Sequence, residues 1–321
     1  MDKILLRDVC FIYGKGTPFE QRALDHIDLS IKSGRITGVI GHTGSGKSTM
    51  MMLLNGLAKP TSGTVLLDGY DINSRAQDVM ESWLKEEPYA GMHRGAAKRA
   101  IKKEIERRKR QLCFRVGLVM QYPEYQLFEE TVYKDIAYGP SNMGLSEKEI
   151  KERVLSAMRQ SGLPEELCDV SPFDLSGGQK RRVAIAGVIA MRPEVLVLDE
   201  PAAGLDPQGR EQIFGEIRNY QRETGSTVIL VSHSMEDMAE YCDDLAVLAH
   251  SKIVLQGTRE EVFSHVDLLE TVDLDIPQIT KLIRILRARG LELPDNLYTV
   301  DGAVAALRQL YARMGKDGDA R

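Results

Sequence analysis

The sequence is poor in cysteine and in aromatic residues, and it lacks any long apolar run. Its four cysteines are scattered among 321 residues, a spacing that argues against a disulfide framework and against a zinc site. The longest uninterrupted apolar stretch, residues 183–191, is well short of the roughly 18 residues that a membrane-spanning helix needs. The charged first residues hold no apolar signal core, so we expect neither secretion nor a membrane span.

Positive charge is not in excess either. The formal net charge of −5 argues weakly against a general nucleic-acid binder, which is usually basic. Hydrophobic residues make up 43% of the chain and charged residues 28%, which is ordinary usage for a folded globular protein. The length suits one large domain or two modest ones.

Apolar runs alternate with helical stretches along the middle of the chain. Residues 35–40 predict a buried strand, followed by a glycine-rich turn and a helix that begins near Lys47. The continuous apolar runs 195–198 and 227–231 are typical of parallel strands covered on both faces. We therefore expect an α/β fold with a mostly parallel sheet flanked by helices.

The two ends of the chain differ from this pattern. The opening segment and residues 65–69 look like short strands with polar turns, which predicts an antiparallel layer beside the main sheet. After about residue 265, helical spacing predicts two helices separated by Gly290 and Pro294. We expect a nucleotide-binding domain over residues 1–265, with a charged expansion at about 74–112, and a helical appendage over 266–321.

Residues 41–48 fit the phosphate-loop pattern G-x-x-x-x-G-K-S/T at every fixed position and lie between a predicted strand and a predicted helix. Glycines let backbone N–H groups surround phosphates, and the helix N-terminus adds partial positive charge. Lys47 is expected to reach the β- and γ-phosphates, and Ser48 to ligate Mg²⁺. The residues expected to surround the nucleotide phosphates are Gly41, His42, Thr43, Gly44, Ser45, Gly46, Lys47, Ser48 and Thr49.

The strand at 195–198 ends in two acids. Asp199 stands at the carboxyl end of a parallel strand, where it can hold the Mg²⁺ that bridges the phosphates. Glu200 is placed to polarise the attacking water as a general base. Either acid alone could be an ordinary strand-end carboxylate, but together with Lys47 they indicate nucleotide hydrolysis.

The segment Leu175-Ser176-Gly177-Gly178-Gln179 precedes a helical run. Two glycines ahead of a helix make a second anion-binding terminus, which a site with its own phosphate loop does not need. Here the sequence resembles the ATP-binding-cassette family, whose signature motif is LSGGQ. The resemblance implies that Ser176, Gly178 and Gln179 meet the ATP bound by an opposite subunit, in a head-to-tail dimer with ATP and Mg²⁺ at the interface.

Other parts of that family's pattern follow in order. The resemblance implies that Gln121 touches the metal or water and senses the partner subunit, and that His233 reaches the γ-phosphate. A lone histidine is more often structural, but His233 ends a third predicted parallel strand and points into the same crevice. By the same resemblance Asp206 joins the two sites across the dimer, and Tyr13 stacks on adenine, although Phe11 could take its place.

Several strings go beyond the general cassette pattern. Residues 121–132, 135–140 and 275–280 look like the energy-coupling factor transporter ATPases. The loop 16–20 is more similar to the second of that family's two paralogous ATPase subunits. The resemblance covers most of the chain.

This resemblance implies a set of partners. A second ATPase subunit, identical or paralogous, would complete the dimer. A transmembrane coupling subunit would dock near Gln121–Val132 through helices that carry arginines, with Glu124 the favoured acidic contact and Glu129 and Glu130 beside it. These acids could equally form a solvated loop. A substrate-binding membrane subunit for a vitamin or a transition-metal ion would be contacted only indirectly, so the substrate is not encoded here.

The predicted expansion contains a basic stretch at 98–110, with eight basic and two acidic residues and so a net charge of +6. A solvated helix face is the simplest interpretation. Attraction to anionic headgroups or to a partner is an alternative. Aromatic residues for base stacking are not interleaved with it, so we expect no nucleic-acid partner.

Taken together, the residues and the resemblance predict an ATP-hydrolysing subunit of an energy-coupling factor importer, peripheral at the cytoplasmic face of the cell membrane. The alternative is a soluble cassette ATPase that acts on nucleic acid or ribosomes. Such proteins usually carry a long coiled coil or two fused cassettes, which this chain lacks. A third possibility is a cassette that binds ATP without hydrolysing it, but intact Glu200 and His233 argue against that.

Overall fold

The computed structural model describes residues 1–74 and 76–318 of the chain. Arg75, inside the predicted expansion, and residues 319–321 of the predicted appendage lie outside the described residues. Among the described residues, none of the helices combines the length and the apolar character needed to cross a membrane.

A six-stranded sheet forms the centre of the molecule, in the order β10-β9-β3-β8-β7-β6. Its strands pair in parallel except at one edge, where β10 runs antiparallel to β9. Every residue of β3, β7, β8 and β9 is buried, which explains their continuous apolar sequences. The strands are β3 (Ile36–Ile40), β6 (Val116–Val119), β7 (Val195–Asp199), β8 (Thr227–Val231), β9 (Asp244–Ala249) and β10 (Lys252–Thr258).

A second, antiparallel sheet has the order β2-β1-β4-β5. Its strands are β1 (Asp2–Tyr13), β2 (Gln21–Lys32), β4 (Ser62–Leu67) and β5 (Tyr70–Asp71). The predicted antiparallel layer is therefore present, but the prediction of short strands at the start was wrong, since β1 and β2 have 12 residues each. The register between β1 and β2 shifts at several points, and Asp8 (φ 51°) and His26 (φ 52°) have left-handed backbone. These irregularities let the two strands stay paired where their alternation of apolar and polar residues breaks.

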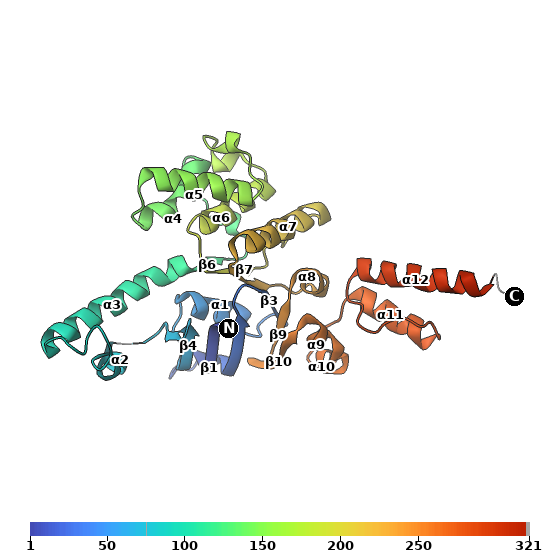
Figure 1. Ribbon diagram of the computed structural model, residues 1–321, viewed down its shortest axis with the longest axis horizontal. Coiled ribbons are helices and arrows are strands. Elements are labelled where there is room, and N and C mark those ends of the chain that lie inside the picture. The colour runs from blue at the N-terminus through green and yellow to red at the C-terminus, as the bar shows by residue number, and fades with distance from the viewer. Residues whose placement is uncertain (75, 319–321) are drawn as a thin grey trace.

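The helices surround the sheets on several sides (Figure 1). Helix α1 packs between the sheets, whereas α4, α5 and α6 pack on one another as a helical subdomain. Helices α2 and α3 project from one side of the molecule, and α11 and α12 from the other. Their bounds are α1 (Lys47–Asn55), α2 (Ala76–Trp83), α3 (Arg94–Arg115), α4 (Val132–Asn142), α5 (Glu147–Gln160), α6 (Gly177–Ile189), α7 (Pro207–Thr224), α8 (Met235–Tyr241), α9 (Arg259–Ser264), α10 (Val266–Thr271), α11 (Gln278–Ala288) and α12 (Val300–Gly318).

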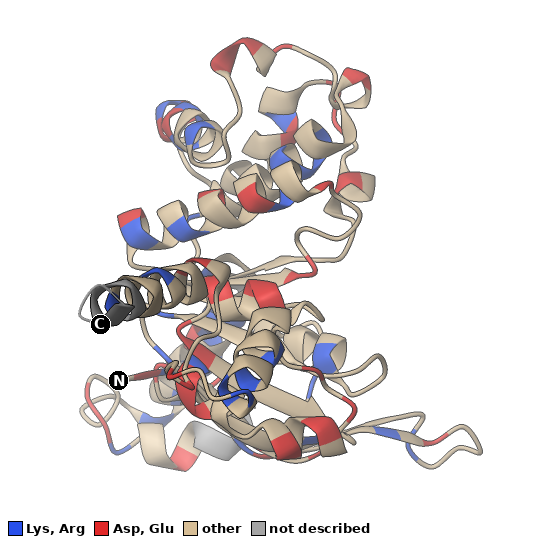
Figure 2. Ribbon diagram, turned by 90° about the vertical axis from the view of Figure 1, so that its right-hand side faces the viewer, with Lys and Arg blue, Asp and Glu red and all other residues tan. Residues whose placement is uncertain are grey.

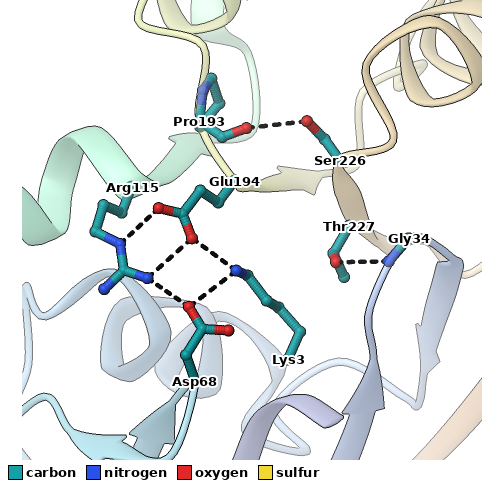
Figure 3. A network of polar contacts seen from close by, with 8 residues as sticks. All are labelled: Lys3, Gly34, Asp68, Arg115, Pro193, Glu194, Ser226 and Thr227. Carbon is teal, nitrogen blue, oxygen red and sulfur yellow. Dashed lines mark hydrogen bonds and ion pairs between the residues drawn. The ribbon is translucent and has the colours of Figure 1, made fainter. Parts of the chain in front are cut away.

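A polar network fixes the inner end of α3 to both sheets (Figure 3). Arg115, the last residue of α3, donates from Nε to Glu194 at 2.8 Å and from Nη2 to Asp68 at 2.5 Å. Lys3 of β1 donates to the same two carboxylates, at 2.6 Å and 2.9 Å. The hydrogen bond from Arg115, with help from Lys3, lowers the pKa of Glu194 to about 2. The projecting helix is thus anchored where β7 begins.

Charged residues of both signs are interspersed over the molecule rather than gathered in one single-sign face (Figure 2). The predicted basic stretch lies on α3, where Arg107 and Arg108 both pair with Glu104. Arg108 also lies over the rings of Tyr70 and Trp83, 4.4 Å and 4.9 Å from their centroids. Part of the predicted positive charge is therefore paired with groups of the same chain.

Candidate active site

The phosphate loop depends on glycine at three positions. Gly44 and Gly46 have left-handed φ angles of 81° and 108°, which other residues rarely adopt. A Cβ on Gly46 would lie 2.3 Å from the carbonyl oxygen of Ala23, and one on Gly41 would lie 2.2 Å from that of Leu248. The loop therefore fits tightly between β2 and β9 and ends at the N-terminus of α1, where its N–H groups can bind an anion.

Lys47 lies along this loop. Its Nζ donates to the carbonyl oxygens of Gly41 at 2.6 Å and of His42 at 2.9 Å. Burial lowers the pKa of Lys47, although the carboxylates of Glu200 and Asp199 act in the opposite direction. An incoming phosphate oxygen could accept the same ammonium hydrogens, so the side chain is placed for the predicted contact.

Ser48 and Asp199 meet at the carboxyl end of β7. The Ser48 hydroxyl donates to Asp199 Oδ2 at 3.2 Å. Asp199 is buried, and this burial raises its pKa. A divalent cation would offset that unfavourable burial of charge, and hydroxyl and carboxylate oxygens are ligands that suit Mg²⁺. The residues present therefore fit the predicted magnesium site.

Glu200 and His233 are in direct contact. His233 Nδ1 lies 2.8 Å from Glu200 Oε1. The Glu200 side chain is 13% exposed and that of His233 is 79% exposed, so the pair runs from the sheet edge to the surface. Glu200 has a left-handed φ of 49°, and its N–H donates to the Val231 carbonyl at 2.9 Å. The turn after β7 thus aims the carboxylate at the histidine that follows β8.

Aromatic and imidazole rings border the loop. The Tyr13 hydroxyl is 3.0 Å from Thr49 Oγ1, and the Tyr13 ring, 41% exposed, makes an edge contact with Phe11. His42 lies beside His250, with ring centroids 5.7 Å apart. The exposed face of Tyr13 suits the predicted adenine contact, and His250 is a neighbour that the sequence did not indicate.

The signature segment lies apart from these groups, at the start of α6. Ser176 and Gln179 form a capping box: the Gln179 N–H donates to Ser176 Oγ, and the Ser176 N–H donates to Gln179 Oε1. A Cβ on Gly177 or Gly178 would meet nothing within 4 Å among the described residues. This helix N-terminus is open, as a contact with an external anion requires.

Gln121 follows β6 and is exposed. In the described part of the chain no hydrogen bond joins it to Ser48 or Asp199. Asp206 is also exposed, and it caps α7 by accepting the Gly209 N–H at 2.7 Å. Among the described residues, contacts and charge interactions join Lys47, Ser48, Asp199, Glu200 and His233. No hydrogen bond between described residues joins this group to Gln121, Asp206, Ser176, Gly178 or Gln179.

The docking contact expected of Glu124 stays a prediction, but its carboxylate already has a cationic partner within the chain. Glu124 accepts from Arg181 Nε at 3.0 Å and from Nη2 at 2.7 Å, so its charge is already paired within the chain. Nearby, Glu130 pairs with Lys134. Sequence reasoning missed Arg181 because its partner is far away along the chain, and a single sequence carries no signal for such a pairing.

Comparison with known proteins agrees with this geometry. A family model described as ABC transporter matches residues 24–203. The chain is 47% identical over 301 residues to the energy-coupling factor transporter ATP-binding protein EcfA2 of Clostridium acetobutylicum, which covers 94% of this chain and 95% of that protein. It is 48% identical over 300 residues to EcfA2 of Caldanaerobacter subterraneus, with 94% of each chain covered.

Solved structures show the same fold. CbiO1 from Clostridium perfringens, described as part of the ABC transporter complex cbiONQ, superimposes with a TM-score of 0.66 at 35% identity, covering 88% of this chain and 99% of that one. The ATP-binding cassette MJ0796, in a dimeric post-hydrolysis state bound to ADP and Pi, gives 0.62 at 25% identity, covering 80% and 98%. The chain therefore belongs to the ABC transporter family and, within it, to the energy-coupling factor transporter ATP-binding proteins.

Proposed function

We propose that this chain hydrolyses ATP as one of two cassette subunits of an energy-coupling factor importer, at the cytoplasmic face of a membrane. The observation that carries the proposal is the division of the site. Lys47, Glu200 and His233 converge at one edge of the sheet, whereas no described residue outside the adjoining backbone lies within 4 Å of a Cβ built on either signature glycine of α6. Each ATP would then be enclosed by the phosphate loop of one subunit and the signature motif of the other.

Within the site, the phosphate loop and Lys47 bind the phosphates, and Ser48 and Asp199 would hold Mg²⁺. Bound there, Mg²⁺ would neutralise negative charge on the phosphates. Glu200 accepts a proton from the water whose oxygen attacks the γ-phosphorus while the bond to the bridging oxygen of ADP breaks. His233 orients Glu200 through their 2.8 Å contact and, being exposed, can reach the γ-phosphate when the dimer closes.

The segment Gln121–Val132 is proposed to receive the transmembrane coupling subunit. It carries exposed aromatic side chains, Tyr125 at 84% and Phe128 at 57% exposure, and Tyr138 at 51% lies against Phe128. Exposed aromatic groups of this kind mark protein interaction sites. Docking would therefore use apolar contacts beside Glu124 rather than a free Glu124 carboxylate. The substrate, a vitamin or a transition-metal ion, would be selected by a separate membrane subunit.

Residues 1–265 are proposed to act as the ATPase domain and residues 266–321 as a helical appendage that contacts the second ATPase subunit. Leu282 and Ile285 on α11 are 45% and 52% exposed, and Val304 on α12 is 39% exposed. These apolar side chains support a protein contact there. A soluble cassette acting on nucleic acid or ribosomes is not favoured, because the relatives that cover 94% of the chain are transporter ATP-binding proteins.

Substitution Glu200→Gln tests this function. Removing the base should lower ATP turnover by about 100-fold or more, while the dissociation constant for ATP stays within about threefold, because the phosphate loop is unchanged. Glu211→Gln, at an exposed position of α7, serves as the control and should behave like the unaltered chain. ATP turnover by Glu200→Gln close to that of the unaltered chain would contradict the assignment of Glu200 as the general base.

A further inference from the structure

Arg181 is a buried arginine whose guanidinium is fully engaged. Its side chain is 3% exposed, and Nε and Nη2 form a two-point contact with the Glu124 carboxylate. Nη1 donates to the carbonyl oxygens of Ala203 at 2.5 Å and of Pro201 at 3.4 Å. A buried charge is costly unless it is paired and hydrogen-bonded, so this group holds its partners in one fixed arrangement.

The partners of Arg181 come from three functional segments. Glu124 and Tyr122 follow Gln121 in the proposed docking segment, and the Tyr122 ring centroid lies 5.9 Å from Arg181 Cζ. Pro201 and Ala203 lie in the turn between Glu200 and Asp206. Arg181 itself belongs to α6, whose first turn holds the signature glycines. One side chain therefore contacts the docking segment and the loop after the catalytic base, and it shares a helix with the signature motif.

We infer that Arg181 is a positioning residue that transmits movement of the docking segment to both halves of the shared ATP site. The inference rests on the proposed function, because it assumes that residues 121–132 meet the coupling subunit. A planar guanidinium in a two-point contact fixes direction as well as distance. Displacement of Glu124 must therefore either move α6 together with the 201–203 turn or break the contact. Arg181 does not touch ATP in this account.

The test uses the complex purified from membranes with its partner subunits. Arg181→Met, Glu124→Gln and the double variant are compared for kcat, for KM and for the dissociation constant of ATP. Arg153→Met is the matched control, because Arg153 lies in the same helical subdomain and donates to the carbonyls of Ala190 and Met191 without contacting a motif. Arg181→Lys keeps the charge but loses the two-point contact, and it replaces Arg181→Met if that variant does not fold.

We expect each single variant at residues 181 and 124 to lower kcat by about tenfold. The kcat of the double variant should be no lower than that of the slower single variant, because the two substitutions remove the same contact. The dissociation constant for ATP should stay within about threefold, and Arg153→Met should keep kcat within about twofold. The inference is overturned if Arg181→Met or Arg181→Lys behaves like Arg153→Met, or if the two effects multiply. Failure of the proposed function would look different, since turnover would then persist in Glu200→Gln.

Discussion

Glu216 on α7 is a partly buried glutamate whose carboxyl group titrates near neutral pH. Glu216 is 17% exposed in its side chain and lies 3.3 Å from Arg182 Nε. Burial raises its pKa to about 7, even though the charge of Arg182 acts in the opposite direction. The pair joins α7 to the signature helix α6, so its protonation affects how firmly the helical subdomain is held to the core.

Substitution Glu216→Gln should reveal this pKa in the free energy of unfolding. Glu216 binds its proton more tightly in the folded state, where its pKa is about 7, than in the unfolded state, where its pKa is the ordinary 4.5. The free energy of unfolding of the unaltered chain, relative to that of the variant, is therefore highest below pH 4.5 and falls as the pH rises to about 7. Urea unfolding across this range measures the difference. Exposed Glu223→Gln is the control, and a Glu216→Gln difference that does not vary with pH would contradict the account.

At the residue scale, the motifs predicted which candidate catalytic groups lie side by side, because the strands themselves bring them together. Asp199 ends β7 and His233 follows β8, and because these strands are adjacent and parallel, their carboxyl ends share one sheet edge. The same reasoning could not foresee that Arg181 already pairs with Glu124. That contact depends on how the helical subdomain packs, and this packing has no local sequence signal.

At the scale of single elements, the N-terminus of α6 contains more glycine than its own packing needs. Gly177 and Gly178 lie in the first helical turn with open space where a Cβ would stand. Glycine weakens a helix by roughly 0.5–1 kcal/mol relative to alanine. The first turn of α6 is therefore less stable than it could be, at the surface that we propose faces the partner's ATP.

Substitution Gly178→Ala should therefore separate stability from activity. We expect the free energy of unfolding to rise by about 0.5 kcal/mol, while ATP turnover falls by at least about tenfold because the methyl group meets the partner's nucleotide. Gly215→Ala, within α7 and likewise with open space around its Cβ, should stabilise without loss of turnover. Unchanged turnover in Gly178→Ala would show that this surface does not meet ATP.

Element lengths were harder to predict than element types. Parallel strands β3, β7 and β8 were recognisable because burial on both faces leaves an uninterrupted apolar sequence. The pairing of β1 with β2 was not, since Asp8 and His26 interrupt the alternation with left-handed backbone and make one long strand look like several short ones. Such irregular positions are fixed by the neighbouring strand, which the sequence alone does not show.

At the scale of the whole molecule, the chain contains the parts of an ATP site but does not assemble them on itself. The phosphate loop begins α1 between the sheets, whereas the signature motif begins α6 in the helical subdomain (Figure 1). Closure by a second cassette, in the dimer that we propose, would bring one subunit's loop to the other's signature. We propose that each ATP is bound at such a shared site.

Protection of the signature surface by ATP tests that claim most directly. Gly177→Cys is placed in a Glu200→Gln background with the exposed Cys113 changed to serine, and the rate of maleimide alkylation is measured in the purified complex with and without ATP. The phosphate loop begins α1 and residue 177 begins α6 in the helical subdomain (Figure 1), so protection of residue 177 by ATP indicates that a partner has closed over it. We predict that ATP slows alkylation by about tenfold or more. An alkylation rate that stays the same while ATP is bound would contradict the shared site.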